Sequence, residues 1–200
     1  MTITAHAGAL GTAPNTLESV EICMRAAPLI EVDVRFCGDT PILSHDKNKN
    51  APPLEDCLAL LAGTRTGVNL DMKEHSHIAG IVALVRQYGL EGRAFFTGVR
   101  AREVDAVRES GLPYYLNCVP KRMSRNAGLV QAAVGLGCVG LNIHYKAASA
   151  KLLKEAHAAG LLVSVWTVDT AAAMRQMIRL GVDNLTTHRP DLCEGLLHAV

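Results

Sequence analysis

The sequence predicts a (β/α)8 barrel, also called a TIM barrel, and two observations lead to that fold class. Strand-like apolar runs alternate with amphipathic helical stretches along the whole chain. Glycines close the helical stretches at regular intervals, and a strand-like run soon follows each of them, at Gly63, Gly89, Gly111, Gly137, Gly160 and Gly181. Strict alternation of strand and helix implies parallel strands, and eight such units imply a closed barrel.

Eight segments have the composition of strands. They are Ile3–Ala7, Leu29–Phe36, Val68–Lys73, Ala94–Thr97, Tyr114–Val119, Val139–Tyr145, Leu162–Val168 and Asn184–Thr187. Helices are expected to begin near Asn15, Pro53, His77, Arg102, Ser124, Ser149, Thr170 and Asp191. Asn15 and Ser149 are predicted N-caps, and Pro53 suits a first helical turn. An open, doubly wound sheet is the alternative arrangement.

Length and composition predict one compact domain, residues 1–200, that is cytoplasmic and free of membrane spans. The net charge of +1 implies no broad attraction to nucleic acid or to a membrane surface. The first residues lack the pattern of a secretory signal, and no apolar run approaches the ~20 residues of a membrane span. The six cysteines are scattered, without a C-x-x-C pair, and are interpreted as reduced thiols. The oligomeric state, monomer or homodimer, stays open.

Several candidate functional residues lie close together in residues 29–46, LIEVDVRFCGDTPILSHD. Glu31 and Asp33 lie two residues apart on a predicted strand, so their carboxylates project from the same face. A second short strand, Pro41–Ser44, then delivers His45. A solvated acidic strand face is the alternative interpretation. The apolar residues that alternate with the carboxylates favour a functional site instead.

Other predicted segments add groups suited to binding a phosphate and transferring protons around it. With Glu31 and Asp33, Asp71 makes three hard oxygen ligands without a cysteine, a set that suits Mg²⁺ or Ca²⁺. Lys73 follows on the same face, and a lysine beside a cation is suited to hold a phosphate oxygen. His6 and His45 arrive from separate segments, and two imidazoles can serve as base and acid around a phosphate.

Further polar residues lie at strand positions whose side chains are expected to face the barrel mouth. His144 and His188 are candidate substrate contacts, although a structural role is equally open for both. Trp166 is a candidate substrate platform or a core residue. The H-x-H spacing of His75 and His77 could bind a metal, but a solvated helix entry is the favoured interpretation. Two asparagines at the same level, Asn117 and Asn142, either orient a metal-bound water or satisfy the barrel mouth.

The motifs in combination resemble the glycerophosphodiester phosphodiesterase family over nearly the whole chain. They are HAG at His6–Gly8, APNT at Ala13–Thr16, EVDVRF at Glu31–Phe36, PILSHD at Pro41–Asp46, NLDMKE at Asn69–Glu74, VWTVD at Val165–Asp169 and GVDNLTTHRPD at Gly181–Asp191. The resemblance implies a TIM barrel that hydrolyses a small-molecule phosphodiester with a divalent cation. It implies His6 and His45 as acid and base, Glu31, Asp33 and Asp71 as metal ligands, Lys73 as a phosphate contact and Trp166 as a residue of the substrate groove.

Several positions depart from the family pattern. Ala7 replaces an arginine that helps to hold the phosphate, Asp71 stands where the family usually has glutamate, and His188 replaces an aspartate. The usual insertion after the second histidine is nearly absent. We expect Arg189 or Lys146 to substitute in part for the missing arginine.

Two alternative functions remain beside hydrolysis to glycerol 3-phosphate and an alcohol. The first is a phospholipase D-like lyase on the same barrel, which would give a cyclic phosphate. The second is a barrel that binds a phosphate ligand without turnover. Ala7 favours this binding role, whereas the two histidines and three carboxylates argue against it.

Overall fold

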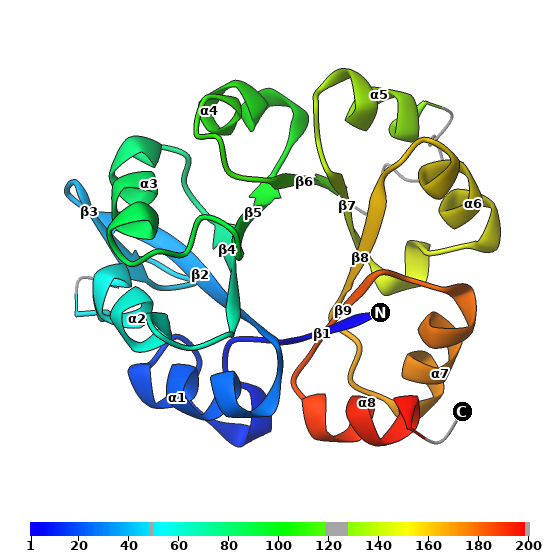
Figure 1. Ribbon diagram of the computed structural model, residues 1–200, viewed down its shortest axis with the longest axis horizontal. Coiled ribbons are helices and arrows are strands. Elements are labelled where there is room, and N and C mark those ends of the chain that lie inside the picture. Colours follow the sequence, from blue (N-terminus) through cyan, green and yellow to red (C-terminus); the bar gives the residue numbers. More distant parts are fainter. Residues whose placement is uncertain (49, 119–127, 199–200) are drawn as a thin grey trace.

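The computed structural model describes residues 1–48, 50–118 and 128–198. Within them, eight parallel strands close into a barrel, with helices around the outside (Figure 1). The strand β1 (Thr2–Ala5) pairs with both β2 (Leu29–Cys37) and β9 (Asn184–Thr187), which joins the two ends of the sheet. This closure confirms the predicted TIM barrel and excludes the open sheet, in which β1 could not have both partners.

The other barrel strands are β4 (Gly67–Met72), β5 (Ala94–Val99), β6 (Tyr114–Cys118), β7 (Gly140–His144) and β8 (Leu162–Trp166). A further strand, β3 (Thr40–Leu43), runs antiparallel to β2 as a short hairpin. Each of the eight predicted strands overlaps an observed one. The predicted end of one, Val119, lies outside the described residues.

The helices are α1 (Leu17–Ala26), α2 (Leu54–Leu61), α3 (Ile78–Gln87), α4 (Val104–Arg108), α5 (Leu129–Gly135), α6 (Ala150–Ala158), α7 (Ala171–Leu180) and α8 (Pro190–Leu197). Short 3-10 turns occupy Ala9–Gly11, Ala101–Glu103 and Tyr145–Ala147. The helix start predicted near Ser124 lies outside the described residues. No helix within the described ranges has the length and apolar character needed to cross a membrane.

One of the two predicted helix caps is confirmed. The Ser149 hydroxyl accepts a hydrogen bond from the Leu152 N–H at the start of α6. The prediction for Asn15 was wrong, because Thr16 caps α1 by accepting from the Ser19 N–H at 3.1 Å. Asn15 instead has a left-handed backbone, φ 58°, and its side chain turns toward β2.

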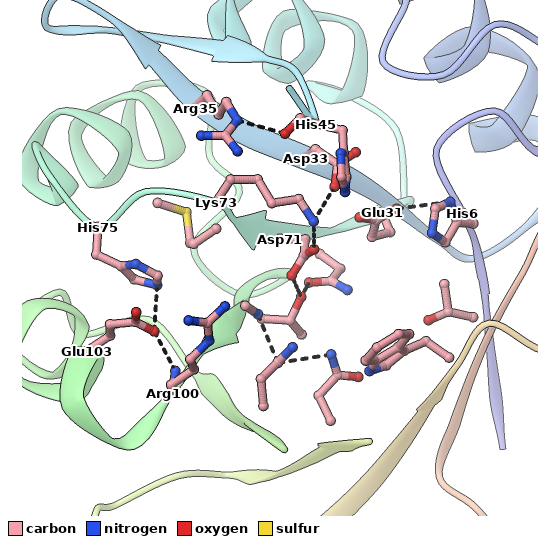
Figure 2. A pocket seen from close by; sticks show the side chains of 18 of the residues that line it. His6, Glu31, Asp33, Arg35, His45, Asp71, Lys73, His75, Arg100 and Glu103 are labelled. Carbon is pink, nitrogen blue, oxygen red and sulfur yellow. Dashed lines mark hydrogen bonds and ion pairs between the residues drawn. The ribbon is translucent and has the colours of Figure 1, made fainter. Parts of the chain in front are cut away.

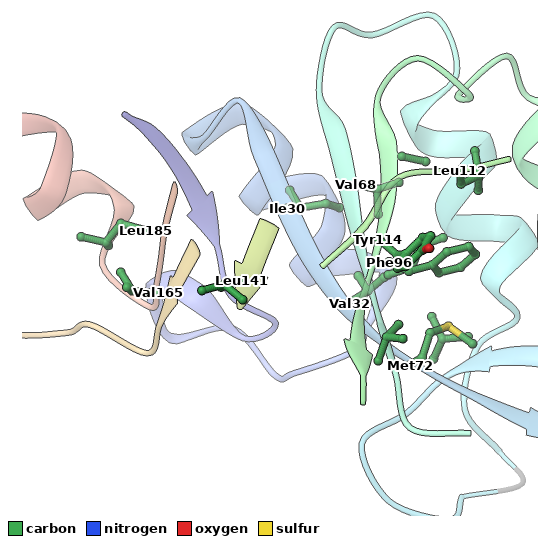
Figure 3. Packing of buried hydrophobic residues seen from close by; sticks show 14 of the residues in the cluster. Ile30, Val32, Val68, Met72, Phe96, Leu112, Tyr114, Leu141, Val165 and Leu185 are labelled. Atoms are coloured by element: carbon green, nitrogen blue, oxygen red, sulfur yellow. The ribbon is translucent and has the colours of Figure 1, made fainter. Parts of the chain in front are cut away.

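Alternation along the strands separates an apolar outer face from a polar interior. Side chains such as Ile30, Val32, Val68, Val165 and Leu185 are buried in the hydrophobic core between strands and helices (Figure 3). The intervening positions point into the barrel, and many of them are polar. The strand ends therefore bring polar groups from many strands together at one mouth.

Hydrogen bonds between neighbouring strands satisfy the polar interior beneath the mouth. The Thr4 hydroxyl donates to Asn184 Oδ1 at 2.8 Å, and Asn184 Nδ2 donates to Ser164 Oγ at 2.9 Å. Between the neighbouring strands β7 and β6, Asn142 Nδ2 donates to Asn117 Oδ1 at 3.1 Å. These bonds offset the cost of burying polar groups and give the site above them a fixed floor.

Candidate active site

Three carboxylates meet at the carboxyl ends of β2 and β4. Asp33 pairs in register with Asp71 on the adjacent strand, and Glu31 lies two residues before Asp33 on the same face. One oxygen from each carboxylate lies within 4.8 Å of the other two. Because Glu31 and Asp33 are buried, at 5% and 3% exposure, their mutual repulsion is poorly screened.

Lys73 partly neutralises this cluster. Its Nζ lies 2.7 Å from Asp33 Oδ1 and also contacts Asp71 Oδ2. Burial alone would lower the pKa of Lys73, but the carboxylates of Asp71 and Asp33 outweigh that effect and raise it. Burial, with the charges of Asp33 and Asp71, raises the pKa of Glu31 well above its ordinary value. One ammonium therefore does not balance three carboxylates.

Each carboxylate is held by a donor from another segment. Asn15 Nδ2 donates to Asp33 Oδ2 at 2.7 Å, while Asn15 Oδ1 accepts from the Asp33 N–H at 3.0 Å. The Ala7 N–H donates to Glu31 Oε2 at 3.0 Å. The Thr97 hydroxyl on β5 lies 3.0 Å from Asp71 Oδ1. These contacts fix the direction of the carboxylates before any ligand binds.

His6 and His45 approach the cluster from the β1 end and from the segment after β3. His6 Nδ1 lies 2.9 Å from the Ala7 carbonyl oxygen and 3.6 Å from Glu31 Oε2. A proton on Nδ1 that is donated to this carbonyl leaves Nε2 with a free lone pair. His45 is exposed; its carbonyl oxygen accepts a 2.7 Å hydrogen bond from Arg35 Nε, and its ring Nδ1 lies 3.2 Å from Asp46 Oδ1. The His6 ring is thus held through a backbone carbonyl, whereas Arg35 holds the backbone of His45.

These groups line one cavity of about 500 Å³ (Figure 2). Nine residues singled out in the sequence lie along it: His6, Glu31, Asp33, His45, Asp71, Lys73, Asn117, Asn142 and Trp166. Trp166 is half-buried, and its Nε1 is buried without a hydrogen-bond partner among the described residues. A donor of this kind is available to a polar group in the cavity.

His144 and His188 do not line this cavity. His188 Nδ1 lies 2.9 Å from Asp169 Oδ2, and its ring lies 4.4 Å from the His6 ring, centroid to centroid. His144 stacks on Tyr145 with centroids 4.8 Å apart. The alternation of side chains along the strands predicts that both residues face the mouth. Their rings instead contact Asp169 and Tyr145.

Neither residue expected to replace the arginine missing at Ala7 lines the cavity. Arg189 pairs with Asp191 through Nη2 at 2.7 Å, and Lys146 lies 6.0 Å from the centre of the Tyr145 ring. Among the described residues, the arginines that line it are Arg35, Arg100 and Arg102.

Sequence reasoning missed several cavity or support residues, and only some of them could have been found from a pattern in the sequence. Arg35 follows Glu31 and Asp33 at two-residue intervals on β2, so the sequence pattern could have predicted that it points to the same side. His75 was interpreted as solvated, yet its side chain is only 13% exposed and lines the cavity. Asn15 and Arg100 lie outside the strands, where no periodicity indicates the direction of a side chain.

The carboxylate cluster fits a hard divalent cation. The donors are oxygens, they are close together, and the burial of two of them makes their charges costly without a cation. Glu31, Asp33 and Asp71 are therefore the residues suited to hold Mg²⁺ or Ca²⁺.

Comparisons with known proteins identify the family and the fold of the chain. The sequence profile of the glycerophosphoryl diester phosphodiesterase family matches residues 64–192, a range that includes Asp71 and Lys73. The matched range does not include His6, Glu31, Asp33 or His45. No curated protein matches the chain significantly.

Solved structures resemble the whole chain. A putative glycerophosphoryl diester phosphodiesterase from Silicibacter pomeroyi has a TM-score of 0.90 and 20% identity, covering 100% of this chain and 93% of that one. One from Agrobacterium tumefaciens has a TM-score of 0.87 and 18% identity, covering 100% and 98%. An Oleispira antarctica phosphodiesterase, solved with the product sn-glycerol-3-phosphate, has a TM-score of 0.86 and 18% identity, covering 99% and 97%.

Proposed function

The chain belongs to the glycerophosphoryl diester phosphodiesterase family, and we propose that it hydrolyses glycerophosphodiesters with a divalent cation, releasing glycerol 3-phosphate and an alcohol. The observation that carries this proposal is the convergence of three carboxylates, Lys73 and two histidines on one cavity. The product bound in the Oleispira antarctica structure supports this substrate class.

Glu31, Asp33 and Asp71 would hold the cation, with Mg²⁺ and Ca²⁺ equally suited to their oxygens. When bound, the cation would draw electron density from the phosphoryl oxygens and offset the charge of the diester. Lys73 adds a fixed positive charge beside the same phosphate.

The two histidines would divide the proton transfers. One accepts a proton from the attacking water as its oxygen bonds to phosphorus. The other donates a proton to the alcohol oxygen as the second phosphorus–oxygen bond breaks. With its proton on Nδ1, His6 would present the Nε2 lone pair to the attacking water, which suits the accepting role. Trp166 offers an indole face and an N–H to the glycerol part.

Hydrolysis of glycerophosphocholine, glycerophosphoethanolamine and a chromogenic diester tests the proposal, with Mg²⁺ or Ca²⁺ and then with excess chelator. We expect cation-dependent turnover that falls about 100-fold or more in His6→Ala and His45→Ala. His157→Ala is the matched control, because His157 pairs with Asp183 on the outside of the barrel. Equal activity in all three variants would contradict the roles of His6 and His45.

The nature of the product distinguishes hydrolysis from the alternative lyase reaction, which would give a cyclic phosphate. Hydrolysis in ¹⁸O-labelled water places solvent oxygen in glycerol phosphate, whereas a lyase yields an unlabelled cyclic phosphate. A folded protein that binds the cation and a diester without turnover would support the binding role instead. Cytoplasmic location, the choice of cation, and substrate contacts by His144 and His188 stay predictions.

A further inference from the structure

The cavity extends beyond the carboxylates on the side away from His6. There it is lined by Arg35, His75, Arg100, Arg102 and Glu103, which we call the arginine side. Figure 2 shows Arg35, His75, Arg100 and Glu103 on the other side of Lys73 and Asp71 from His6. A diester that lies with its phosphate at Lys73 therefore directs one substituent toward His6 and Trp166 and the other toward these arginines.

Two of the three arginines are already neutralised by neighbouring carboxylates. Arg35 Nη1 lies 2.7 Å from Glu74 Oε1, and Arg102 Nε lies 3.2 Å from Glu103 Oε1. Lys73 is likewise paired with Asp33 and Asp71.

The guanidinium of Arg100 is different. Its backbone N–H donates to Glu103 Oε2 at 2.9 Å, but no hydrogen bond or ion pair among the described residues engages its side chain. An uncompensated guanidinium on a cavity wall is suited to bind a carboxylate or a phosphate through two N–H groups.

His75 lies beside this free cation. Its Nε2 is buried without a hydrogen-bond partner among the described residues and lies 3.8 Å from Glu103 Oε2. Burial lowers the pKa of His75, the Glu103 carboxylate opposes this effect, and the positive charge of Arg100 adds to it. Among its described lining residues the arginine side also contains no Trp, Tyr or Phe ring to receive a quaternary ammonium.

From these contacts we infer that the arginine side binds an anionic group on the alcohol of the substrate, with Arg100 as the specificity residue. The inference rests on the proposed hydrolysis and names its substrate class. The favoured substrates are glycerophosphodiesters whose alcohol carries a carboxylate or a second phosphate, and the disfavoured ones carry only a cationic amine.

Two matched substrate pairs test this preference by the ratio of kcat/KM within each protein. Glycerophosphoserine and glycerophosphoethanolamine differ by one carboxylate. Bis(glycerophospho)glycerol, corrected for its two scissile diesters, and glycerophosphoglycerol differ by one glycerophosphate. We expect wild-type ratios of about five to ten in favour of the anionic member of at least one pair, because the guanidinium is partly solvated.

Arg100→Ala should bring that ratio close to one. The control is Arg108→Ala, which removes an arginine paired with Asp105 outside the cavity and should keep the wild-type ratio. A ratio within one variant is insensitive to any loss of folded protein. The pair that shows the preference tells whether the group is a carboxylate or a phosphate.

Two results would overturn the inference while leaving the hydrolysis intact. The first is equal kcat/KM for both members of both pairs in the wild type. The second is an Arg100→Ala variant that loses the same factor on every substrate, which would place Arg100 at the reacting phosphate. Failure to hydrolyse any of the four diesters would overturn the proposed function and this inference with it.

Discussion

Asn15 holds Asp33 through two hydrogen bonds from a backbone conformation that few residues adopt. Its φ of 58° lies in the left-handed region, which asparagine tolerates better than most residues. The conformation turns the amide toward β2, where one end donates to the carboxylate and the other accepts from the backbone of the same residue. Asn15 therefore sets the direction of a candidate metal ligand without binding the metal itself.

Replacing Asn15 by alanine should weaken cation binding. We expect Asn15→Ala to reduce Mg²⁺ or Ca²⁺ affinity about 10- to 100-fold, because the Asp33 carboxylate loses its orienting donor. The buried groups left without partners should also lower the free energy of unfolding by about 1–3 kcal/mol. Calorimetric titration of the cation and urea denaturation measure the two effects.

The neighbouring variant Thr16→Ala is the control. Loss of this helix cap should lower stability by about 1 kcal/mol without changing cation affinity, since Thr16 contacts no carboxylate of the cluster. Equal loss of affinity in both variants would show that local stability, not the Asn15 amide, governs binding.

Among the elements, β2, β4 and β5 build the candidate cation site by their register. Asp33 faces Asp71, and Asp71 faces Thr97, so one row of the sheet carries two ligands and a supporting hydroxyl. Gly98 follows Thr97 with φ +74°, where β5 and β6 are out of even register. Its N–H donates to Asn117 Oδ1 at 2.9 Å, which joins β5 to the floor of the barrel.

Gly98→Ala should disrupt this part of the barrel. The new Cβ would clash with the Met72 carbonyl oxygen and lie 2.8 Å from Asp71 Oδ1, in a backbone conformation that alanine disfavours. We expect a loss of about 3 kcal/mol in the free energy of unfolding and weaker cation binding.

Gly92→Ala serves as the comparison in the same denaturation experiment. A Cβ at Gly92 meets nothing within 4 Å, and its φ is not positive, so stability should change by less than about 0.5 kcal/mol. A Gly98→Ala protein as stable as Gly92→Ala would contradict the close approach of β4 and β5.

At the scale of the whole molecule, the barrel buries more negative charge than it neutralises. The outer faces of the strands supply an apolar core, and the mouth concentrates three carboxylates around one lysine. We therefore expect a bound cation to stabilise the folded protein, because a ligand specific to the folded state shifts the unfolding equilibrium.

Glu31→Gln should raise the melting temperature of the cation-free protein. The amide oxygen can still accept from the Ala7 N–H, but the buried like charge beside Asp33 is gone. A gain of about 1 kcal/mol corresponds to about 2–4 °C for a chain of this size. Saturating Mg²⁺ or Ca²⁺ should raise the melting temperature of the wild type and much less that of Glu31→Gln.

Glu21→Gln is the matched control, because Glu21 is exposed on α1. It should leave both the melting temperature and its response to the cation unchanged. A lower melting temperature in cation-free Glu31→Gln would mean that repulsion within the cluster is not a significant cost.

The sequence by itself determined the barrel and the face of each strand, because both follow from periodicity along the chain. Alternation with period two set Glu31 and Asp33 side by side, and the repeat of strand and helix counted the strands. Only the tertiary structure decided which groups outside the strands reach the cavity. Loops place His75 and Arg100 at the cavity and Asn15 against Asp33, and Asp169 holds the His188 ring outside the cavity lining. Loop side chains follow no period, so their directions depend on contacts with residues distant in the sequence, which only the folded chain brings together.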